Sequence, residues 1–191
     1  MSKILFVNAC TRENSRTLSL AGDVLDYLGG EVDEVKLYEQ DLAPLDADGI
    51  KARDEAALAN DFSSDRFALA RQFAAADTVV IAAPYWDLMF PSVLKVYFEA
   101  ITVNGLTFVY SDKGFPVGLC RASRMIYVTT SGGPLVMNFG FDYASALAKS
   151  FYGINDVRCV SASGLDIRGS NVESIMLSAK DSIAKILSDA Q

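Results

Sequence analysis

Three polar loops contain the side chains of this sequence that are best suited to binding or chemistry. The first runs from Asn8 to Thr17 and joins an apolar segment to a helical pattern. Unpaired N–H groups and the helix dipole at the start of a helix favour an anion. Hydroxyl and guanidinium donors suited to phosphate come from Arg12, Ser15, Arg16 and Thr17. The loop predicts a phosphate site; the alternative is a polar connection whose serine only caps the helix.

The second loop follows Val79–Ile81, a short β-branched run typical of a strand buried in a parallel sheet. A proline comes next, and proline cannot continue a central strand. The residues that leave the strand are Pro84, Tyr85, Trp86, Asp87 and Leu88. Two large aromatic side chains there give a flat apolar surface at the edge where open α/β sheets bind ligands. We expect a flat heterocycle here; the alternative is a pair of core aromatic residues.

The third loop also follows an apolar strand pattern. It contains Thr130, Ser131, Gly132 and Gly133. Two consecutive glycines let the backbone approach a ligand closely. Donors in this loop would meet negative charge that develops on a bound ring. The alternative is an ordinary turn.

The composition excludes several functional classes. The chain has 191 residues, a net charge of −7 and no histidine. Without histidine there is no Ser-His-Asp or Cys-His mechanism and no His-ligated metal site, so difficult chemistry is expected from a cofactor. The negative charge argues against binding of nucleic acid or of a membrane surface. The first loop also lacks the glycine patterns of ATPase and dinucleotide-binding turns.

No targeting or membrane-spanning segment is expected. The N-terminus runs directly into a strand pattern without the long apolar region of a signal peptide, and no apolar run is long enough for a bilayer. The three cysteines, Cys10, Cys120 and Cys159, have neither metal-binding nor disulfide-framework spacing. Reduced thiols and a cytoplasmic location are therefore expected.

Strand and helix patterns alternate along the whole chain. Strands are expected at 4–8, 32–38, 79–81, 124–130 and 157–162, with helices between them. This order predicts one α/β domain over residues 1–191, with helices on both faces of a parallel sheet. Five strands favour the flavodoxin-like order 2-1-3-4-5. In that order the three loops follow the first, third and fourth strands and meet at one edge.

Four local expectations accompany this fold. Residues 39–60 are expected to form a surface connection with about one helical turn, and residues 105–118 a short hairpin or an extended loop. Pro91 is placed at the first position of a helix. Ser170–Glu173 has the spacing of a capping box at the start of the last helix.

With these loops in view, the chain resembles the FMN-dependent NADH azoreductase and quinone oxidoreductase family. The opening strand and Ser15–Thr17 are similar to the phosphate loop of that family, and Ala83–Lys95 is similar to its isoalloxazine segment. Gly105–Tyr110 resembles its hairpin, Thr130–Gly133 its second ring-binding loop, and Gly153–Val157 its last helix-to-strand turn. The resemblance extends essentially from end to end.

The resemblance implies bound FMN, NADH or NADPH as the reductant, and a homodimer with the site at its interface. It implies ping-pong turnover, in which the nicotinamide gives a hydride to flavin N5 before an aromatic acceptor, a quinone or an azo compound, takes its place. Ser15–Thr17 would hold the phosphate, and Pro84–Leu88 and Thr130–Gly133 the ring. No protein acid or base is assigned. Aromatic residues that would cover the flavin are Tyr110, Phe115 and Phe139, with Met137 nearby; their alternative role is core or dimer packing.

The sequence departs from the family pattern in two places. Cys10 stands where a serine is common, so a weaker thiol donor would replace one hydroxyl beside the phosphate. A reactive thiol is the alternative to a structural role there. Tyr85 and Asp87 stand where methionine and asparagine are usual. An ionised Asp87 facing the ring would disfavour the anionic reduced flavin, unless its side chain points away.

Two other functions remain open at the level of sequence. One is a flavodoxin-like electron carrier that does not itself oxidise NAD(P)H. Flavodoxins have a Thr/Ser-x-Thr-Gly-x-Thr loop, whereas this loop contains Arg12 and Arg16. The other is a phosphate-ligand or regulatory protein without a flavin on the same fold.

Overall fold

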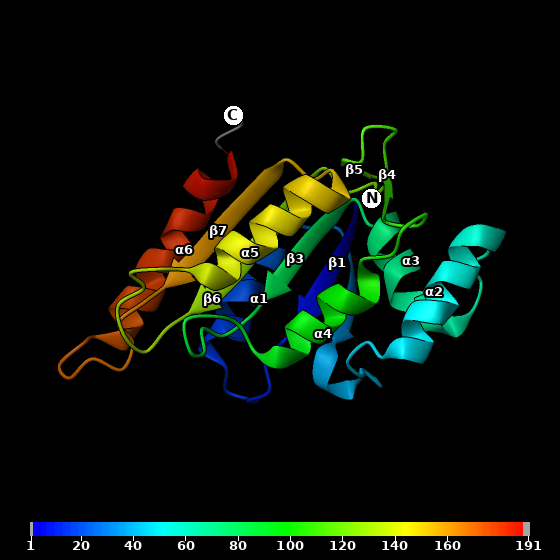
Figure 1. Cartoon of the computed structure of the whole chain (residues 1–191). Coiled ribbons are helices and arrows are strands. Elements are labelled where there is room, and N and C mark those ends of the chain that lie inside the picture. Colours follow the sequence, from blue (N-terminus) through cyan, green and yellow to red (C-terminus); the bar gives the residue numbers. More distant parts are fainter. Residues whose placement is uncertain (1, 189–191) are drawn as a thin grey trace.

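A parallel sheet of five strands forms the centre of the molecule, as the computed structural model of residues 2–188 shows (Figure 1). The strand order is β2-β1-β3-β6-β7. Because β4 and β5 form a separate hairpin, β6 and β7 are the fourth and fifth strands of this sheet, and the predicted order 2-1-3-4-5 is confirmed. The sheet consists of β1 (Lys3–Asn8), β2 (Glu31–Lys36), β3 (Thr78–Ala82), β6 (Arg124–Thr130) and β7 (Asp156–Ala162).

Helices cover both faces of this sheet, as predicted. On one face α1 (Arg16–Leu28) and α6 (Val172–Ser188) pack on the even residues of β1, such as Ile4 and Phe6. On the other face α3 (Ala68–Ala75), α4 (Ser92–Ile101) and α5 (Phe139–Leu147) pack on its odd residues. The period-2 alternation of a strand explains this division.

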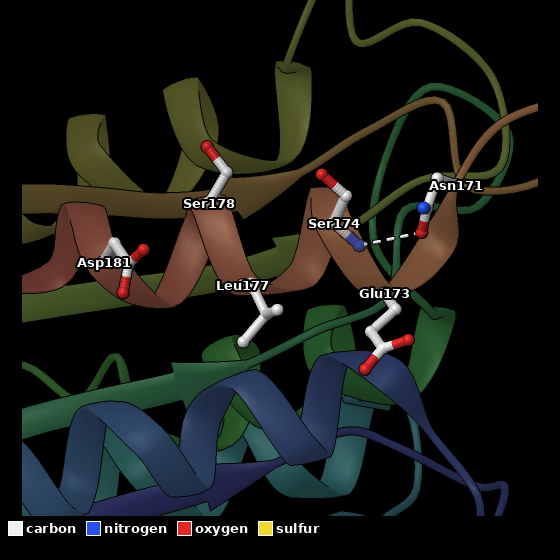
Figure 2. A pocket seen from close by; sticks show the side chains of 6 residues that line it. All are labelled: Asn171, Glu173, Ser174, Leu177, Ser178 and Asp181. Atoms are coloured by element: carbon white, nitrogen blue, oxygen red, sulfur yellow. Dashed lines mark hydrogen bonds between the residues drawn. The ribbon is translucent and has the colours of Figure 1, made fainter.

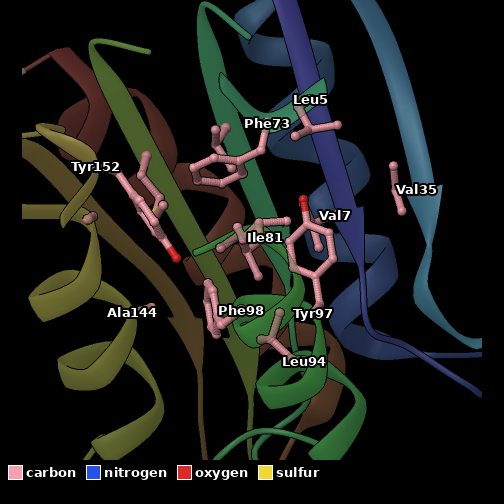
Figure 3. Packing of buried hydrophobic residues seen from close by; sticks show 14 of the residues in the cluster. Leu5, Val7, Val35, Phe73, Ile81, Leu94, Tyr97, Phe98, Ala144 and Tyr152 are labelled. Carbon is pink, nitrogen blue, oxygen red and sulfur yellow. The ribbon is translucent and has the colours of Figure 1, made fainter. Parts of the chain in front are cut away.

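The larger core lies on the face covered by α3, α4 and α5 (Figure 3). Phe73 of α3 and Tyr152 pack edge to face, with ring centroids 4.8 Å apart. Leu5 and Ile81 from the sheet and Phe98 from α4 complete the centre of this cluster. These side chains are at most 1% exposed, so the apolar pattern of the central strands reports burial on both faces.

The hydroxyl group of Tyr97 in α4 is an unfavourable contact in this core. It is fully buried and has no hydrogen-bond partner within residues 2–188. Replacing Tyr97 with Phe is expected to raise the free energy of unfolding by about 1 kcal/mol, because it removes an unsatisfied buried polar group. Tyr152→Phe is the matched control: its hydroxyl lies 2.6 Å from Oγ1 of Thr102, so this change is expected to lower stability by about 1 kcal/mol. Urea unfolding curves measure the free energy of unfolding of both variants. An equal loss of stability in the two would contradict the assignment of the Tyr97 hydroxyl as an unsatisfied group.

The prediction of a surface connection at 39–60 is wrong, because the segment contains α2 (Ala47–Ala59). Asp46 caps its start by accepting a hydrogen bond from the N–H of Gly49 at 2.8 Å. Asn60 ends it in a left-handed conformation with φ 50°. No residue of α2 is buried, so the helix has no apolar stripe by which its periodicity could be recognised.

Helix ends account for two more corrections. The start of α6 is capped by Asn171, whose side chain accepts from the N–H of Ser174 at 3.0 Å, not by Ser170. Pro91 precedes the first turn of α4 as its N-cap residue. A 3-10 turn, η2 (Asp65–Phe67), directly precedes α3. A second 3-10 turn, η1 (Leu37–Glu39), follows β2, and α5 continues into a π-helical turn, η3 (Ala148–Tyr152).

The hairpin expected at 105–118 is confirmed. It consists of β4 (Phe108–Tyr110) and β5 (Pro116–Gly118), paired antiparallel. Gly118 rests directly on the backbone of Tyr152 and Gly153, with no space for a Cβ atom. Since β7 begins at Asp156, the hairpin lies at the edge of the sheet where the strands begin.

Two absences hold for residues 2–188. No helix there is both long and apolar enough to cross a membrane. Within the same range no group of three acidic, histidine or cysteine side chains is arranged to hold a metal ion.

Candidate functional site

One cavity collects all three predicted loops at the carboxyl edge of the sheet. Its volume is about 250 Å³. Ten predicted residues line it, namely Arg12, Ser15, Arg16, Thr17, Pro84, Tyr85, Trp86, Thr130, Ser131 and Gly132. Thr11, Asn14, Leu165 and Asp166 also line it and were not predicted. Cys10, Asp87, Leu88 and Gly133 were predicted but do not line it.

Other hollows are larger but differ in chemistry. One of about 490 Å³ lies between the end of β7 and α6 and has no charged lining residue. A second, of about 400 Å³, lies along α6, and its charged lining residues, Glu173 and Asp181, are both acidic (Figure 2). A third hollow of about 520 Å³ between α2 and α4 has four acidic residues against two arginines in its lining. None of these three is lined by residues of the predicted loops, so the cavity at the carboxyl edge is the candidate site.

The N-terminus of α1 forms one end of the cavity. Ser15 is the N-cap residue, and its hydroxyl oxygen accepts from the N–H of Leu18 at 3.2 Å. Within residues 2–188 the N–H groups of Arg16 and Thr17 have no acceptor. Two orphaned donors at the positive end of a thirteen-residue helix fit an anion. The capping role of Ser15 therefore leaves the N–H groups of Arg16 and Thr17 available to an anion.

Thr17 is more buried than a surface phosphate ligand would be. It is 1% exposed, and its hydroxyl oxygen lies 2.6 Å from that of Thr130. This pair joins the first turn of α1 to the end of β6. The hydroxyl of Thr17 thus connects two walls of the cavity.

The two arginines of the first loop differ in their partners. Nη2 of Arg16 lies 2.7 Å from a carboxylate oxygen of Asp166, and Nη1 donates to the carbonyl of Leu165 at 3.2 Å. Arg12 is exposed, and in the described part of the chain its side chain has no ion pair. Arg12 is therefore the guanidinium free to meet an anion.

Cys10 lies behind the cavity wall. Its Sγ is 3.8 Å from the carbonyl oxygen of Ala82. Burial raises the pKa of the thiol, and a hydrogen bond with Ser15 opposes this shift only partly. The thiol is therefore protonated at neutral pH, which favours the structural role over a reactive one.

The second loop stays paired with β6 beyond Pro84. Ala83 donates to Val128 at 3.0 Å and Tyr85 donates to Thr130 at 3.1 Å. β3 nevertheless ends at Ala82, so the expectation that Pro84 does not continue the strand is confirmed, although pairing with β6 extends one residue beyond the proline, to Tyr85. Proline fits because Ala83 and Tyr85, on either side of it, make the hydrogen bonds to β6.

A two-residue turn then reverses the chain. Trp86 and Met89 exchange backbone hydrogen bonds of 2.9 and 2.8 Å. The central residues, Asp87 and Leu88, have φ values of 50° and 69°. Two positive φ values define a type I′ turn, which usually requires Asn-Gly. The N–H groups of Asp87 and Leu88 have no acceptor within residues 2–188, and the two residues directly follow Trp86, which lines the cavity.

The third loop contains two different glycines. A Cβ atom on Gly132 would lie 2.3 Å from a carboxylate oxygen of Asp166, so this glycine makes room for a protein side chain. A Cβ atom on Gly133 would have nothing within 4 Å. Close approach by a ligand is therefore possible at Gly133, whereas at Gly132 the space is taken by Asp166.

The three aromatic residues predicted to cover the flavin lie at two different edges of the sheet. Phe139 begins α5, next to the third loop, and is 45% exposed. Tyr110 and Phe115 belong to the hairpin, at the edge where the strands begin. These two side chains cannot cover the cavity of their own chain, so the expectation is wrong for a single chain.

Leu165 and Asp166 were missed because they follow β7, whose loop carries no distinctive pattern. The predicted strand order could have indicated their position. Since β7 lies beside β6, the loop after β7 must lie beside the loop after β6, and Asp166 donates its N–H to Gly132 at 2.9 Å.

Comparison with known proteins assigns this arrangement to a family. The profile of a family described by its flavodoxin-like fold matches residues 2–187. An FMN-dependent NADH:quinone oxidoreductase of Coprothermobacter proteolyticus is 32% identical over 91% of this chain and 92% of its own length. The chain belongs to the FMN-dependent NADH:quinone oxidoreductase and azoreductase family. Another FMN-dependent NADH:quinone oxidoreductase, from Clostridium beijerinckii, is 33% identical over 95% of this chain and 96% of its own length.

Solved structures agree with this quinone oxidoreductase and azoreductase family. The crystal structure of an azoreductase from Bacillus anthracis strain Sterne superimposes with a TM-score of 0.82 at 25% identity, over 97% of this chain and 98% of that one. An FMN-dependent NADH-azoreductase from the Ames Ancestor strain, solved in complex with FMN, has a TM-score of 0.77 over 97% and 99% of the two chains. At 22% identity, the second likeness supports the fold alone.

Proposed function

We propose that this protein is an FMN-dependent NADH oxidoreductase that reduces quinones, azo compounds or similar electron-poor acceptors. The observation that carries the proposal is the cavity itself, where orphaned N–H groups at a helix N-terminus lie across from an aromatic wall. Bound FMN would accept a hydride from the nicotinamide and deliver it to the acceptor. The curated relatives bear this activity in their names.

Each end of the cavity has a role in this proposal. The N–H groups of Arg16 and Thr17, the hydroxyl of Ser15 and the guanidinium of Arg12 would bind the phosphate. Tyr85 and Trp86, which line the cavity, would form the wall along the ring. Gly133 lies outside the lining, but its backbone leaves space for a ligand to approach. The N–H groups of Asp87 and Leu88, which have no acceptor within residues 2–188, would donate to polar ring atoms. We assign no general acid or base among these residues.

A homodimer explains the position of the hairpin. Its exposed apolar side chains are Tyr110, Phe115 and Val117, at 57%, 69% and 48% exposure. They lie at the edge opposite the cavity of their own chain, so only a second copy offers them a cavity to cover. The proposal includes one domain over residues 1–191 and a cytoplasmic location, for which the three free cysteines provide support.

An absorption spectrum before and after anaerobic addition of NADH tests the proposal. The purified protein is expected to show oxidised flavin absorbance that NADH bleaches and a quinone restores. A flavin that NADH leaves oxidised, but that forms a stable semiquinone with dithionite, would favour the electron carrier. A protein that binds no added FMN would overturn the proposal.

Tyr85→Phe tests whether the hydrogen bond from Tyr85 to the loop at Met137 contributes to binding of the electron acceptor. The Tyr85 hydroxyl donates to the carbonyl of Met137 at 2.8 Å and holds the loop that presents Val136, which is 84% exposed. Losing this bond is expected to raise KM for a quinone about fivefold, while flavin content stays unchanged. Tyr27→Phe, at an exposed position of α1, is the control. An unchanged KM would mean that the loop keeps its position without the hydroxyl.

A further inference from the structure

The loop after β7 places a carboxylate against the wall of the cavity. Gly164 donates to Gly133 at 2.9 Å, Leu165 to Ser131 at 3.2 Å and Asp166 to Gly132 at 2.9 Å. These bonds continue the pairing of β6 and β7 beyond both strand ends. The backbone therefore fixes the position of Asp166, and the missing side chain of Gly132 makes room for its carboxylate.

Arg16 reaches this carboxylate from the first turn of α1. Its two terminal nitrogens bind Asp166 at 2.7 Å and the carbonyl of Leu165 at 3.2 Å. The guanidinium is thus already held by two acceptors. These two contacts hold the guanidinium against the loop after β7.

A carboxylate beside an anion site weakens anion binding unless a cation neutralises it. We propose that Arg16 serves to neutralise Asp166 at the phosphate end of the cavity, and that Arg12 supplies the cation that meets the phosphate. Arg16 is then a positioning residue, not a phosphate ligand. The proposal rests on the proposed function, because it concerns the phosphate of bound FMN.

Binding of FMN and of riboflavin to the apoprotein separates the two roles, since riboflavin lacks the phosphate. Arg16→Gln leaves Asp166 unpaired and is expected to weaken FMN binding about fivefold to tenfold, with riboflavin affinity nearly unchanged. Asp166→Asn added to Arg16→Gln removes the repulsion. The double variant is therefore expected to bind FMN within about twofold of the wild type.

Arg12 provides the matched comparison. Arg12→Gln is also expected to weaken FMN binding about tenfold, but adding Asp166→Asn should not restore wild-type affinity, because the lost cation itself met the phosphate. Arg16→Lys keeps the charge and should retain FMN affinity, which covers the case in which Arg16→Gln does not fold. Thermal unfolding of each apoprotein checks its folding.

The outcomes are distinct. The proposal is supported if Asp166→Asn restores FMN affinity to Arg16→Gln but does not restore it to Arg12→Gln. An Arg16 loss that persists in the double variant makes Arg16 a direct phosphate ligand and overturns it. If the wild type binds neither FMN nor riboflavin, the proposed function fails and this inference fails with it.

Discussion

Gly118→Ala is expected to cost about 3 kcal/mol or more of the free energy of unfolding, although it adds a single methyl group. The added Cβ would lie 2.1 Å from the carbonyl carbon of Tyr152 and 2.2 Å from the backbone nitrogen of Gly153. Both are backbone atoms just before β7, so no side-chain rotation relieves the overlap. The hairpin must move away from the sheet, and urea unfolding will measure the loss.

A second glycine provides a control of opposite sign. Gly22 lies inside α1, and a Cβ atom there would meet nothing within 4 Å. Gly22→Ala is expected to raise stability by up to about 1 kcal/mol through helix propensity. Wild-type stability in Gly118→Ala would show that β5 does not rest on the backbone before β7. In the proposed dimer, Gly118→Ala should also weaken association, which size-exclusion chromatography with light scattering will detect.

Asp87→Asn is expected to raise the midpoint potential of the bound flavin by about 30 mV, equivalent to about tenfold in the two-electron reduction equilibrium. Asp87 is exposed, and within residues 2–188 it has no ion-pair partner. Its charge beside the turn that faces the proposed ring would disfavour a reduced, anionic flavin. Asparagine also tolerates the φ of 50° at this position, so the turn is preserved. Potentiometric titration of the holoprotein measures the shift.

Asp181→Asn is the control for this experiment, because it removes an exposed charge on α6, away from the cavity. Its potential should equal that of the wild type. A shift at Asp87 that shrinks with added salt would support a charge effect through solvent. No shift at low salt would mean that the Asp87 carboxylate points away from the ring.

The sheet and the meeting of the three loops were predictable because they depend on local patterns. Val79–Ile81 reports burial, and the alternation of strands and helices restricts the topology to a few choices. The strand order then brings the loops after β1, β3 and β6 to one edge. Ten of the predicted cofactor residues line one cavity for this reason.

What the sequence did not reveal depends on partners far away in the chain. Arg16 was expected to meet phosphate, but its partner, Asp166, is 150 residues distant. Tyr110 and Phe115 were assigned by chemistry without regard to the edge at which their hairpin lies. The helix α2 was missed for a different reason: with no buried residue, it lacks the periodicity on which sequence analysis relies.

The order of the strands has a consequence during synthesis on the ribosome. β1 is made first but lies between β2 and β3, so one of its edges stays unpaired until residues 78–82 have emerged. Five of its six residues are buried in the finished protein, so the incomplete sheet exposes apolar side chains next to unpaired backbone N–H and C=O groups. Nascent chains that end before residue 78 should therefore bind chaperones or aggregate, whereas each later strand adds to an edge that already exists.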